Sequence, residues 1–257
     1  MEDFTGKVAL VTGTTGIGRA VALRLAKDGA AVVALGIDEA GNEALAQADP
    51  AVRVRKTDVA EPAQVEAALG EIEREFGGLD VIVNAAAVHP YGDAVTTDPK
   101  TFRHCLAVNV GSIHLTAHWG VPLMRRRGGG TIVNISSVQG HACQQGVAAY
   151  VASKGAIHAL TRAMALDFAA DGIRVVSVSP GSVRTPILEL AARTFDGPDA
   201  DVEAVFARFG ASHPIGRIGE PEEIAELITF LASSKAGFIT GSDYVIDGGL
   251  TAAIGVR

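Results

Sequence analysis

Seven short apolar runs recur along the chain, and most of the gaps between them carry apolar residues at helical spacing. Runs of this length that are rich in Val and Ile are typical of buried strands. Strands that alternate with helices predict a parallel sheet, because the helix is the crossover that parallel strands require. We therefore predict an α/β fold built on a doubly wound, seven-stranded parallel sheet with helices on both faces. The runs are VALVT, AAVVALG, VRVRKT, LDVIVNA, TIVNIS, IRVVSVS and DYVID.

The alternation continues through the whole sequence without a long linker, a low-complexity tract or an internal repeat. We therefore expect residues 1–257 to form a single domain. The stretch from Ile187 to Pro221 is the exception, because DGPD and His213-Pro214 interrupt its helical pattern. We expect a mobile substrate lid near residues 187–215.

Composition and charge narrow the classes of function. Hydrophobic residues make up 48% of the chain, which excludes a disordered protein and supplies a sizeable core. The formal net charge of -7 disfavours a nucleic acid or an anionic membrane as a partner. The amino-terminal residues lack the layout of a signal peptide, and no apolar run approaches the roughly 18 residues of a membrane span. The low cysteine content fits a reducing cytoplasm.

Three polar groups have simple structural interpretations. Cys105 and Cys143 lack the spacing of a disulfide framework or a zinc knuckle. His114 and His118 stand four residues apart, but H-L-T-A-H lacks the Glu of H-E-x-x-H, so we expect a solvated or interface face and no metal site. The basic run at residues 125–127 precedes three glycines, which is typical of the end of a helix.

The glycine-rich stretch VTGTTGIGRA follows the first strand-like run and precedes a helical pattern. This is the context of a dinucleotide-binding turn, in which backbone N–H groups and the helix dipole attract a pyrophosphate. For this stretch alone, a tight strand-to-helix turn without a ligand is the alternative.

In an open α/β sheet, ligands bind beyond the carboxyl ends of the strands. The residues that follow each strand-like run are therefore the candidate site. Besides the glycine turn, they are Gly36-Ile37-Asp38, Thr57-Asp58-Val59, Asn84-Ala85-Ala86-Ala87, Ser136-Ser137 and Pro180-Gly181-Ser182.

Tyr150 and Lys154 are expected one helical turn apart on the same face of a helix. An ammonium group stabilises a phenolate, which favours acid/base chemistry by a tyrosine whose reference pKa is near 10. Ser137 lies thirteen residues before Tyr150. The serine hydroxyl and the phenol can converge on one oxygen, to polarise a ketone for hydride attack or to accept a proton from an alcohol. Alone, the Tyr-Lys spacing is a weak signal, and Ser137 fits a turn or a cap.

Together these pieces resemble the classical short-chain dehydrogenase/reductase family, from residue 7 to about residue 249. The resemblance implies a Rossmann-type domain, a nicotinamide cofactor, a secondary alcohol or ketone as substrate, and a homotetramer with interface helices at residues 101–126 and 150–170. The agreeing motifs are Thr12-Gly13 with Gly16-Ile17-Gly18, Asp58-Val59, the run at Asn84, Asn109 in VNVG, Ser137, Tyr150 with Lys154, Pro180-Gly181, Thr185 and ITGSDYVIDGG.

The resemblance also implies a role for each site residue. Tyr150 would be the acid/base, Lys154 would lower its pKa and hold the nicotinamide ribose, Ser137 would position the substrate, and Asn109 would hold a water in the proton relay. The implied cofactor contacts are Gly13, Thr15, Gly16, Ile17, Gly18, Asp38, Asp58, Val59, Asn84, Ala86, Tyr150, Lys154, Pro180, Gly181, Val183 and Thr185.

The glycine turn departs from the family pattern. Only Thr14 and Thr15 separate Gly13 from Gly16, which is one residue fewer than is usual in the family. We expect a working phosphate cradle with a shorter loop.

The choice of cofactor depends on the end of the second strand-like run. The acid that usually holds the ribose hydroxyls of NAD would fall at Gly36, and Asp38 stands two residues further on. No Arg or Lys is present at Thr15 or Ile37 to meet the 2′-phosphate of NADP. We therefore predict NAD, with NADP as the alternative. Asp38 could instead cap the next helix.

Residues 138–149, VQGHACQQGVAA, lead into Tyr150 and are expected to line the substrate pocket. Amides and imidazoles placed there favour a sugar or polyol, although each side chain could equally face water or another subunit. A 3-oxoacyl-thioester reductase, whose Arg cluster at 125–127 would meet an acidic carrier protein, is one alternative, and a non-catalytic dinucleotide sensor is another. The expected substrate contacts are Ser137, Gln139, His141, Gln144 and Tyr150, faced by His89 and Tyr91.

Overall fold

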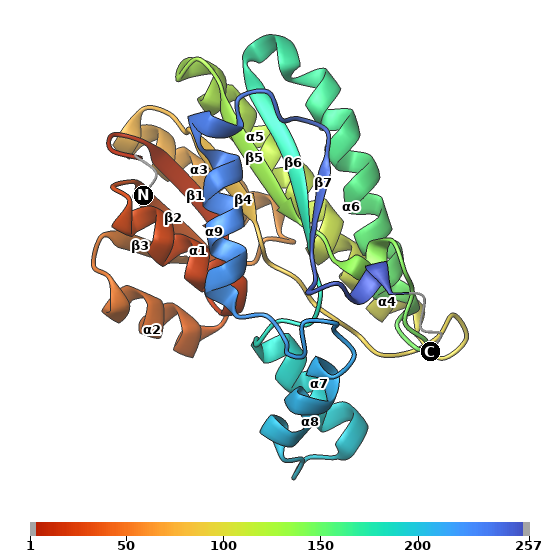
Figure 1. The fold of residues 1–257 in the computed structure, drawn as a ribbon. Coiled ribbons are helices and arrows are strands. Elements are labelled where there is room, and N and C mark those ends of the chain that lie inside the picture. The colour runs from red at the N-terminus through yellow and green to blue at the C-terminus, as the bar shows by residue number, and fades with distance from the viewer. Residues whose placement is uncertain (1–3, 254–257) are drawn as a thin grey trace.

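The structure is a computed structural model that describes residues 4–253. Seven strands form one parallel sheet in the order β3-β2-β1-β4-β5-β6-β7 (Figure 1). The strand order reverses between β1 and β4, so the switch point at which such sheets bind ligands lies there. The predicted doubly wound sheet is confirmed. The strands are β1 (Val8–Thr12), β2 (Ala31–Gly36), β3 (Val52–Lys56), β4 (Val81–Asn84), β5 (Gly130–Ile135), β6 (Ile173–Pro180) and β7 (Asp243–Ile246).

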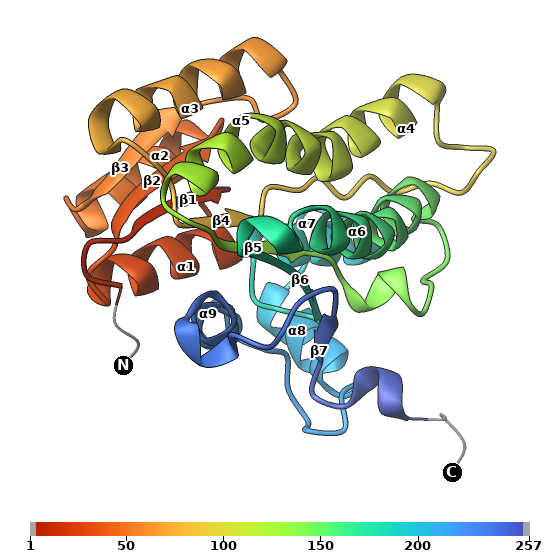
Figure 2. The same cartoon turned by 90° about the horizontal axis from the view of Figure 1, so that it is seen from above.

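Helices cover both faces of the sheet, as Figure 2 shows from above. α1 and α9 lie on one face, and α3, α5 and α6 lie on the other. The helices are α1 (Gly16–Lys27), α2 (Glu39–Ala48), α3 (Pro62–Phe76), α4 (Pro99–Leu106), α5 (Ser112–Arg126), α6 (Ala148–Asp167), α7 (Pro186–Asp196), α8 (Val202–Gly210) and α9 (Pro221–Ala232). A π-helical turn η1 (Ala107–Gly111) joins α4 to α5, and short 3₁₀ turns are η2 (Val138–Gly140), η3 (Ala169–Asp171), η4 (Ser234–Ala236) and η5 (Leu250–Ala252).

The two faces of the sheet have separate apolar cores, because side chains of a strand point alternately to opposite faces. In β1, Ala9 and Val11 join the core under α1 and α9, whereas Val8 and Leu10 join the core under α3, α5 and α6. All four side chains are buried. Burial on both sides explains why the strands read as continuous apolar runs.

Local sequence signals set several helix starts. α3, α4, α7 and α9 each begin with a proline, which fits the first turn because its missing N–H would have no partner there. α5 ends at Arg126 and is followed by Gly128 at φ 83°, as the basic run before the glycines predicts.

α7 and α8 project from the body of the molecule at one end of the sheet (Figure 1). They contact each other around a small core of their own, in which Ala192, Val205, Phe206 and Ile218 are buried. These helices occupy the segment expected to act as a lid, and its mobility stays a prediction.

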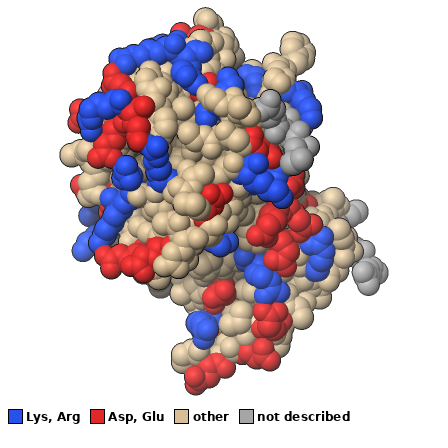
Figure 3. All heavy atoms as spheres, turned by 90° about the vertical axis from the view of Figure 1, so that its left-hand side faces the viewer, with Lys and Arg blue, Asp and Glu red and all other residues tan. Residues whose placement is uncertain are grey.

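The surface is electrostatically mixed. On the face shown in Figure 3, basic and acidic side chains are interspersed. Ion pairs between elements, such as Arg55 of β3 with Glu71 of α3 at 2.8 Å, also occur in the structure. Cys105 is buried, Cys143 is exposed, and both are free thiols. Within residues 4–253, the structure contains no helix with the length and apolar character needed to span a membrane.

Candidate active site

Residues that follow the strands line a cavity of about 730 Å³ at the carboxyl edge of the sheet. Most of the site residues predicted from the sequence line it, whereas Gly18, Asn84, Asn109 and His141 do not. The predicted residues that do so are Gly13, Thr15, Gly16, Ile17, Asp38, Asp58, Val59, Ala86, His89, Tyr91, Ser137, Gln139, Gln144, Tyr150, Lys154, Pro180, Gly181, Val183 and Thr185.

The glycine turn fits a pyrophosphate. α1 begins at Gly16, and its N-cap residue Thr15 makes no side-chain capping bond, so the first N–H groups of the helix are left for a ligand. Gly13 and Gly16 have φ of 92° and 50°, which favour glycine. A Cβ on Gly18 would lie 2.2 Å from the Gly13 carbonyl oxygen, so Gly18 permits close contact between helix and turn without lining the cavity.

The shortened turn is matched to the end of β2. Thr14 is buried, and its side chain occupies the space beside Gly36. A Cβ on Gly36 would lie 2.3 Å from Thr14 Oγ1, which explains why no acidic side chain stands at this position. The turn therefore packs closely against the end of β2, although it is one residue shorter than is usual in the family that it resembles.

Asp38 combines the two roles considered from the sequence. Its carboxylate caps α2 by accepting a hydrogen bond from the Gly41 N–H, and the residue also lines the cavity. An acidic group at this place disfavours a 2′-phosphate, and Lys154, at the other end of the cavity, is the only Lys or Arg among the described lining residues.

Ser137, Tyr150 and Lys154 meet where β5 and α6 come together. A side-chain hydrogen bond joins Ser137 to Tyr150. Lys154 donates from Nζ to the Ile135 carbonyl oxygen at 2.9 Å and lies 5.2 Å from the centre of the Tyr150 ring. The three side chains are buried, so the hydroxyl, the phenol and the ammonium group face the same end of the cavity.

The protonation of this group differs from the expectation that Lys154 lowers the pKa of Tyr150. Burial raises the pKa of Tyr150 well above its usual value, and the hydrogen bond with Ser137 lowers it in part. Burial also lowers the pKa of Lys154 to about 8, because the charged form is poorly solvated. Desolvation is thus the dominant influence on both groups in this structure, and the hydroxyl of Ser137 offsets it at the phenol.

Asn109 acts from behind the cavity. Its Oδ1 accepts from the Val88 N–H at 2.8 Å, and its Nδ2 donates to the Val88 carbonyl oxygen at 3.0 Å and to Ser153 Oγ at 2.9 Å. Asn109 lies in the π-helical turn η1, a distortion that is frequent at functional sites. The side chain therefore holds the loop after β4 against α6, and its predicted place in a proton relay stays a prediction.

Asn84 also lies below the cavity. Its Nδ2 donates to Asn134 Oδ1 at 2.9 Å, and its Oδ1 accepts from Thr116 Oγ1 at 2.8 Å. Asn134 in turn donates to Thr161 Oγ1 at 3.0 Å. This buried chain ties β4 and β5 to α5 and α6, so the amide of Asn84 is used within the protein and not toward the cavity.

An aromatic group covers the catalytic tyrosine candidate. The ring centroids of His89 and Tyr150 are 4.0 Å apart, and those of His89 and Tyr91 are 4.8 Å apart. Tyr91 meets Phe195 of α7 edge to face at 5.4 Å. Burial lowers the pKa of His89 to about 4, so its imidazole is neutral near pH 7. The group links the loop after β4 to the expected lid.

The polar side chains of the loop after β5 point in two directions, toward the cavity and toward β7. Gln139 and Gln144 line the cavity and bond to each other, with Gln139 Nε2 donating to Gln144 Oε1 at 3.0 Å. His141 faces away from the cavity, and its Nε2 lies 2.7 Å from Asp243 Oδ2. The sequence could not separate these residues, because an irregular loop has no fixed periodicity that sets the direction of a side chain.

Comparison with known proteins agrees with this geometry. The family model described as enoyl-(acyl carrier protein) reductase matches residues 11–251. A cyclohexanol dehydrogenase of Acinetobacter sp. (strain SE19) is 37% identical over 259 residues, with coverage of 97% of each chain. The chain belongs to the short-chain dehydrogenase/reductase family.

Solved structures of this family share the whole fold. The aldohexose dehydrogenase of Thermoplasma acidophilum, solved in ligand-free form, has a TM-score of 0.92 and 35% identity, and the match covers 99% of this chain and 97% of that one. The L-sorbose reductase of Gluconobacter frateurii, solved with NADPH and L-sorbose, has a TM-score of 0.91 and 29% identity, with coverage of 98% and 99%. This short-chain dehydrogenase/reductase is an oxidoreductase that acts on CH–OH groups with a nicotinamide cofactor.

The sequence analysis missed one wall of the cavity in this short-chain dehydrogenase/reductase. Ile187, Leu188, Ala191 and Phe195 of α7 line it. These residues follow helical spacing, so an amphipathic reading of the lid segment could have identified the face. The pattern could not show that this face lines the cavity, nor that Leu188 also packs against the small core that α7 shares with α8.

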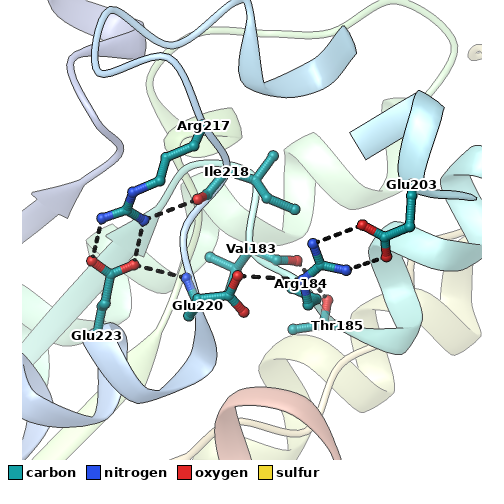
Figure 4. A network of polar contacts seen from close by, with 8 residues as sticks. All are labelled: Val183, Arg184, Thr185, Glu203, Arg217, Ile218, Glu220 and Glu223. Carbon is teal, nitrogen blue, oxygen red and sulfur yellow. Dashed lines mark hydrogen bonds and ion pairs between the residues drawn. The ribbon is translucent and has the colours of Figure 1, made fainter. Parts of the chain in front are cut away.

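Ion pairs join the segments that flank α7 and α8 (Figure 4). Arg184 bonds to Glu203 of α8 and lies 3.3 Å from Glu220 Oε1, which precedes α9. Arg217 makes two bonds of 2.7 Å to Glu223 of α9. Exposed ion pairs of this kind each contribute only about 0–1 kcal/mol to stability. They therefore orient the residues on either side of α7 and α8 but do not hold these helices rigidly.

Proposed function

We propose that this enzyme interconverts a secondary alcohol and a ketone on a substrate with several hydroxyl groups, such as a sugar or a polyol. One observation carries the proposal. His89 Nδ1 and Gln139 Oε1 are buried in the wall of the cavity and have no hydrogen-bond partner among the described residues. Buried polar atoms without partners are costly. A substrate hydroxyl can donate to Gln139 Oε1, and it can donate to or accept from His89 Nδ1 according to the tautomer of the imidazole.

The relatives support the same class of substrate. The names of the two solved relatives give an aldohexose and L-sorbose as their substrates, and the Acinetobacter relative is named for cyclohexanol. The apolar wall formed by Val88, Leu188 and Phe195 would contact the carbon skeleton of such a molecule. The polar atoms opposite would then select for hydroxyls beyond the one that reacts.

Tyr150 and its neighbours carry out the proton transfer in this proposal. When bound, the nicotinamide accepts or gives the hydride. Tyr150 takes the hydroxyl proton of an alcohol or gives one to a ketone, while Ser137 donates a hydrogen bond to the same substrate oxygen. Lys154, charged below about pH 8, would bond to the cofactor ribose, and the hydroxyl of Ser137 would stabilise the phenolate. The orphan N–H groups at Gly16 would hold the pyrophosphate.

We propose NAD as the preferred cofactor, with NADP as the alternative. The acidic side chain of Asp38 lines the cavity near the start of α2, and no Lys or Arg among the described residues lines that end. A 2′-phosphate there would meet a negative charge without a cation to compensate it.

We propose further that the enzyme assembles as a homotetramer in the cytoplasm. β7 leaves one edge of the sheet open, and Phe238, Leu166 and Val245 have exposed fractions of 105%, 82% and 46%. Apolar surface and an open strand edge favour burial against another subunit. Two free thiols fit a reducing compartment. Native mass spectrometry measures the number of subunits, and a monomer would contradict the assembly.

The position of the Arg cluster at 125–127 does not support the alternative of a 3-oxoacyl-thioester reductase. Arg125 pairs with Asp171 at 2.8 Å, Arg126 pairs with Glu73, and Arg127 bonds to Asp80 at 2.9 Å. The cluster precedes β5, so it lies at the opposite end of this strand from the cavity. A carrier protein docked there could not present an acyl group to Tyr150.

A substrate panel tests the proposal. Polyols, aldoses, cyclohexanol and acyl thioesters are assayed with NAD(H) and NADP(H) by the absorbance of the reduced nicotinamide. We expect the highest kcat/KM for a polyhydroxylated substrate with NAD. A preference for an acyl thioester would contradict the substrate assignment, and turnover of no member of the panel would favour the sensor alternative.

A further inference from the structure

We propose that His141, His158 and Asp243 form a binding site for one divalent transition-metal ion such as Zn²⁺ or Co²⁺. One ligand atom from each residue lies within 4.8 Å of the other two, and no other group of three such residues occurs in residues 4–253. His141 Nε2 lies 2.7 Å from Asp243 Oδ2, and His158 Nε2 lies 3.5 Å from Asp243 Oδ1. The sequence analysis expected no metal site, because neither the cysteines nor the pair His114 and His118 has the spacing of a metal-binding motif. It did not consider His141, His158 and Asp243 together.

Three elements build the site. His141 follows η2, His158 lies on α6, and Asp243 is the first residue of β7. The two imidazole rings lie side by side at the carboxylate and are stacked, with centroids 4.2 Å apart and planes 21° apart. Because an imidazole binds a metal in the plane of its ring, the exposed ring of His141 would rotate when an ion binds. Gly140 permits the close approach of the two rings, because a Cβ there would lie 2.5 Å from His158 Cε1.

Asp243 is already oriented to act as a ligand. Its Oδ1 accepts hydrogen bonds from Ser177 Oγ at 2.6 Å and from Ser179 Oγ at 2.9 Å. Such outer contacts fix the direction of a ligating carboxylate and are typical of metal sites. They leave Oδ2, the atom nearest His141, to bind the ion.

The ligand types and distances favour a transition metal over Mg²⁺ or Ca²⁺, which prefer all-oxygen sites. Zn²⁺ binds imidazole nitrogen and carboxylate oxygen at about 2.0–2.2 Å, which places tetrahedral ligands about 3.3 Å apart. The 2.7 Å contact between His141 Nε2 and Asp243 Oδ2 would open slightly to admit the ion. His158 Nε2, which lies 3.5 Å from the other carboxylate oxygen, Oδ1, would move toward the ion. His141 is the exposed member, so a hydrated ion can enter from its side.

Metal binding replaces existing hydrogen bonds. His158 Nε2 now bonds to Ser179 Oγ at 3.0 Å, and His141 bonds to Asp243. An ion would take both ring nitrogens and one carboxylate oxygen, leaving a fourth position for water. If the three residues form only a hydrogen-bonded cluster, they will not bind the ion. A direct measurement of metal binding therefore distinguishes a metal site from a hydrogen-bonded cluster.

The site lies next to the substrate cavity without sharing its residues. His141 belongs to the same loop as Gln139 and Gln144, which line the cavity. An ion that ties His141 to α6 and β7 would hold this loop in place. We therefore assign the metal a positioning role, with no part in the transfer of hydride or proton.

The experiment uses the full chain, free of any affinity tag and stripped with a chelator. Isothermal titration with Zn²⁺ and the visible absorption of bound Co²⁺ are measured for wild type, His141→Ala, Asp243→Asn and His118→Ala. His118 is the matched control, because it is an exposed histidine paired with His114 at a ring distance of 5.9 Å on α5. Thermal unfolding with and without Zn²⁺ gives a readout that is independent of activity.

We expect one Zn²⁺ per chain, strong visible Co²⁺ bands and a higher Tm for wild type and His118→Ala. His141→Ala and Asp243→Asn should lose at least tenfold in affinity, which is the scale for loss of a ligand or its support. His141 is exposed, so its variant should fold even if Asp243→Asn does not. Absence of binding by wild type, or binding that depends on His118 and not on His141, would overturn the proposal.

Discussion

The imidazole of His89 packs against the phenol ring of Tyr150, with centroids 4.0 Å apart and planes 41° apart. Its Nδ1 is buried without a partner among the described residues, in the wall of the cavity that also holds Ser137. A neutral imidazole at this place can bond to a substrate hydroxyl next to the one that reacts. Substrate selection should therefore depend on this atom more than on the catalytic group itself.

Replacement of His89 by Phe should reduce kcat/KM for a polyol about 10- to 100-fold, because the variant keeps the aromatic contact and loses the hydrogen bond. The matched substrate is cyclohexanol, which has no second hydroxyl and should be little affected. Steady-state kinetics on both substrates measure the difference. An equal loss for both would mean that His89 only supports the position of Tyr150.

Replacement of Tyr150 by Phe should lower kcat by about 10²- to 10⁴-fold, because the proton donor and acceptor is removed. The ring that contacts His89 and Lys154 is kept, so the Kd of the cofactor should stay near that of the wild type. Turnover and fluorescence titration of the cofactor check the two halves of this prediction. Turnover close to wild type would show that the phenol does not transfer the proton.

Lys154 should make stability depend on pH. Its pKa is about 8 in the folded protein against the ordinary value of 10.5, so between these values the unfolded chain binds more protons. The free energy of unfolding should rise with pH across this window, by at most about 1.4 kcal/mol per pH unit. Below about pH 8 both states are protonated and this contribution is flat.

Urea unfolding of wild type and Lys154→Met at pH 8 and pH 10 measures this effect. Tyr150 begins to contribute near pH 10, because its unfolded form loses its proton there while burial raises its pKa in the folded protein. The difference between the two proteins removes this contribution and that of other groups. We expect the wild type to gain stability relative to Lys154→Met over this interval. A constant difference would mean that Lys154 keeps an ordinary pKa.

Replacement of Asp38 by Asn should narrow the preference for NAD over NADP by roughly tenfold, because it removes one charge near the adenosine ribose. Asn is as good a helix N-cap as Asp, so α2 should keep its start and the comparison isolates the charge. Titration of both cofactors against both proteins gives the ratio. A wild type that binds NADP more tightly would reverse the assignment.

Replacement of Gly36 by Ala should weaken cofactor binding about tenfold or more. The new Cβ would lie 2.3 Å from Thr14 Oγ1, and relief of such overlap typically costs about 1–3 kcal/mol. Thr14→Ala removes the two nearest clashing atoms and leaves only the contact with Asn42 Oδ1 at 2.9 Å, so the double variant should recover most of the affinity. Calorimetric Kd values for the four proteins form a double-mutant cycle, and additive losses would show that the two residues act independently.

The sequence by itself determined the features that depend on local spacing. β1 reads as VALVT because both faces of the strand are buried, and Tyr150 and Lys154 share a face because one helical turn separates them. The glycine turn and its following helix could be placed for the same reason. The order of the alternating elements also fixed the parallel sheet and its ligand-binding edge.

Only the tertiary structure decided where side chains in loops and on strand ends point. Asn84 and Asn109 turn inward because buried amides must find partners in neighbouring elements. His141 turns outward to Asp243, a residue 102 positions away in the chain. Such pairs depend on how helices, strands and loops pack together. No local pattern in the sequence encodes a contact between residues so far apart in the chain.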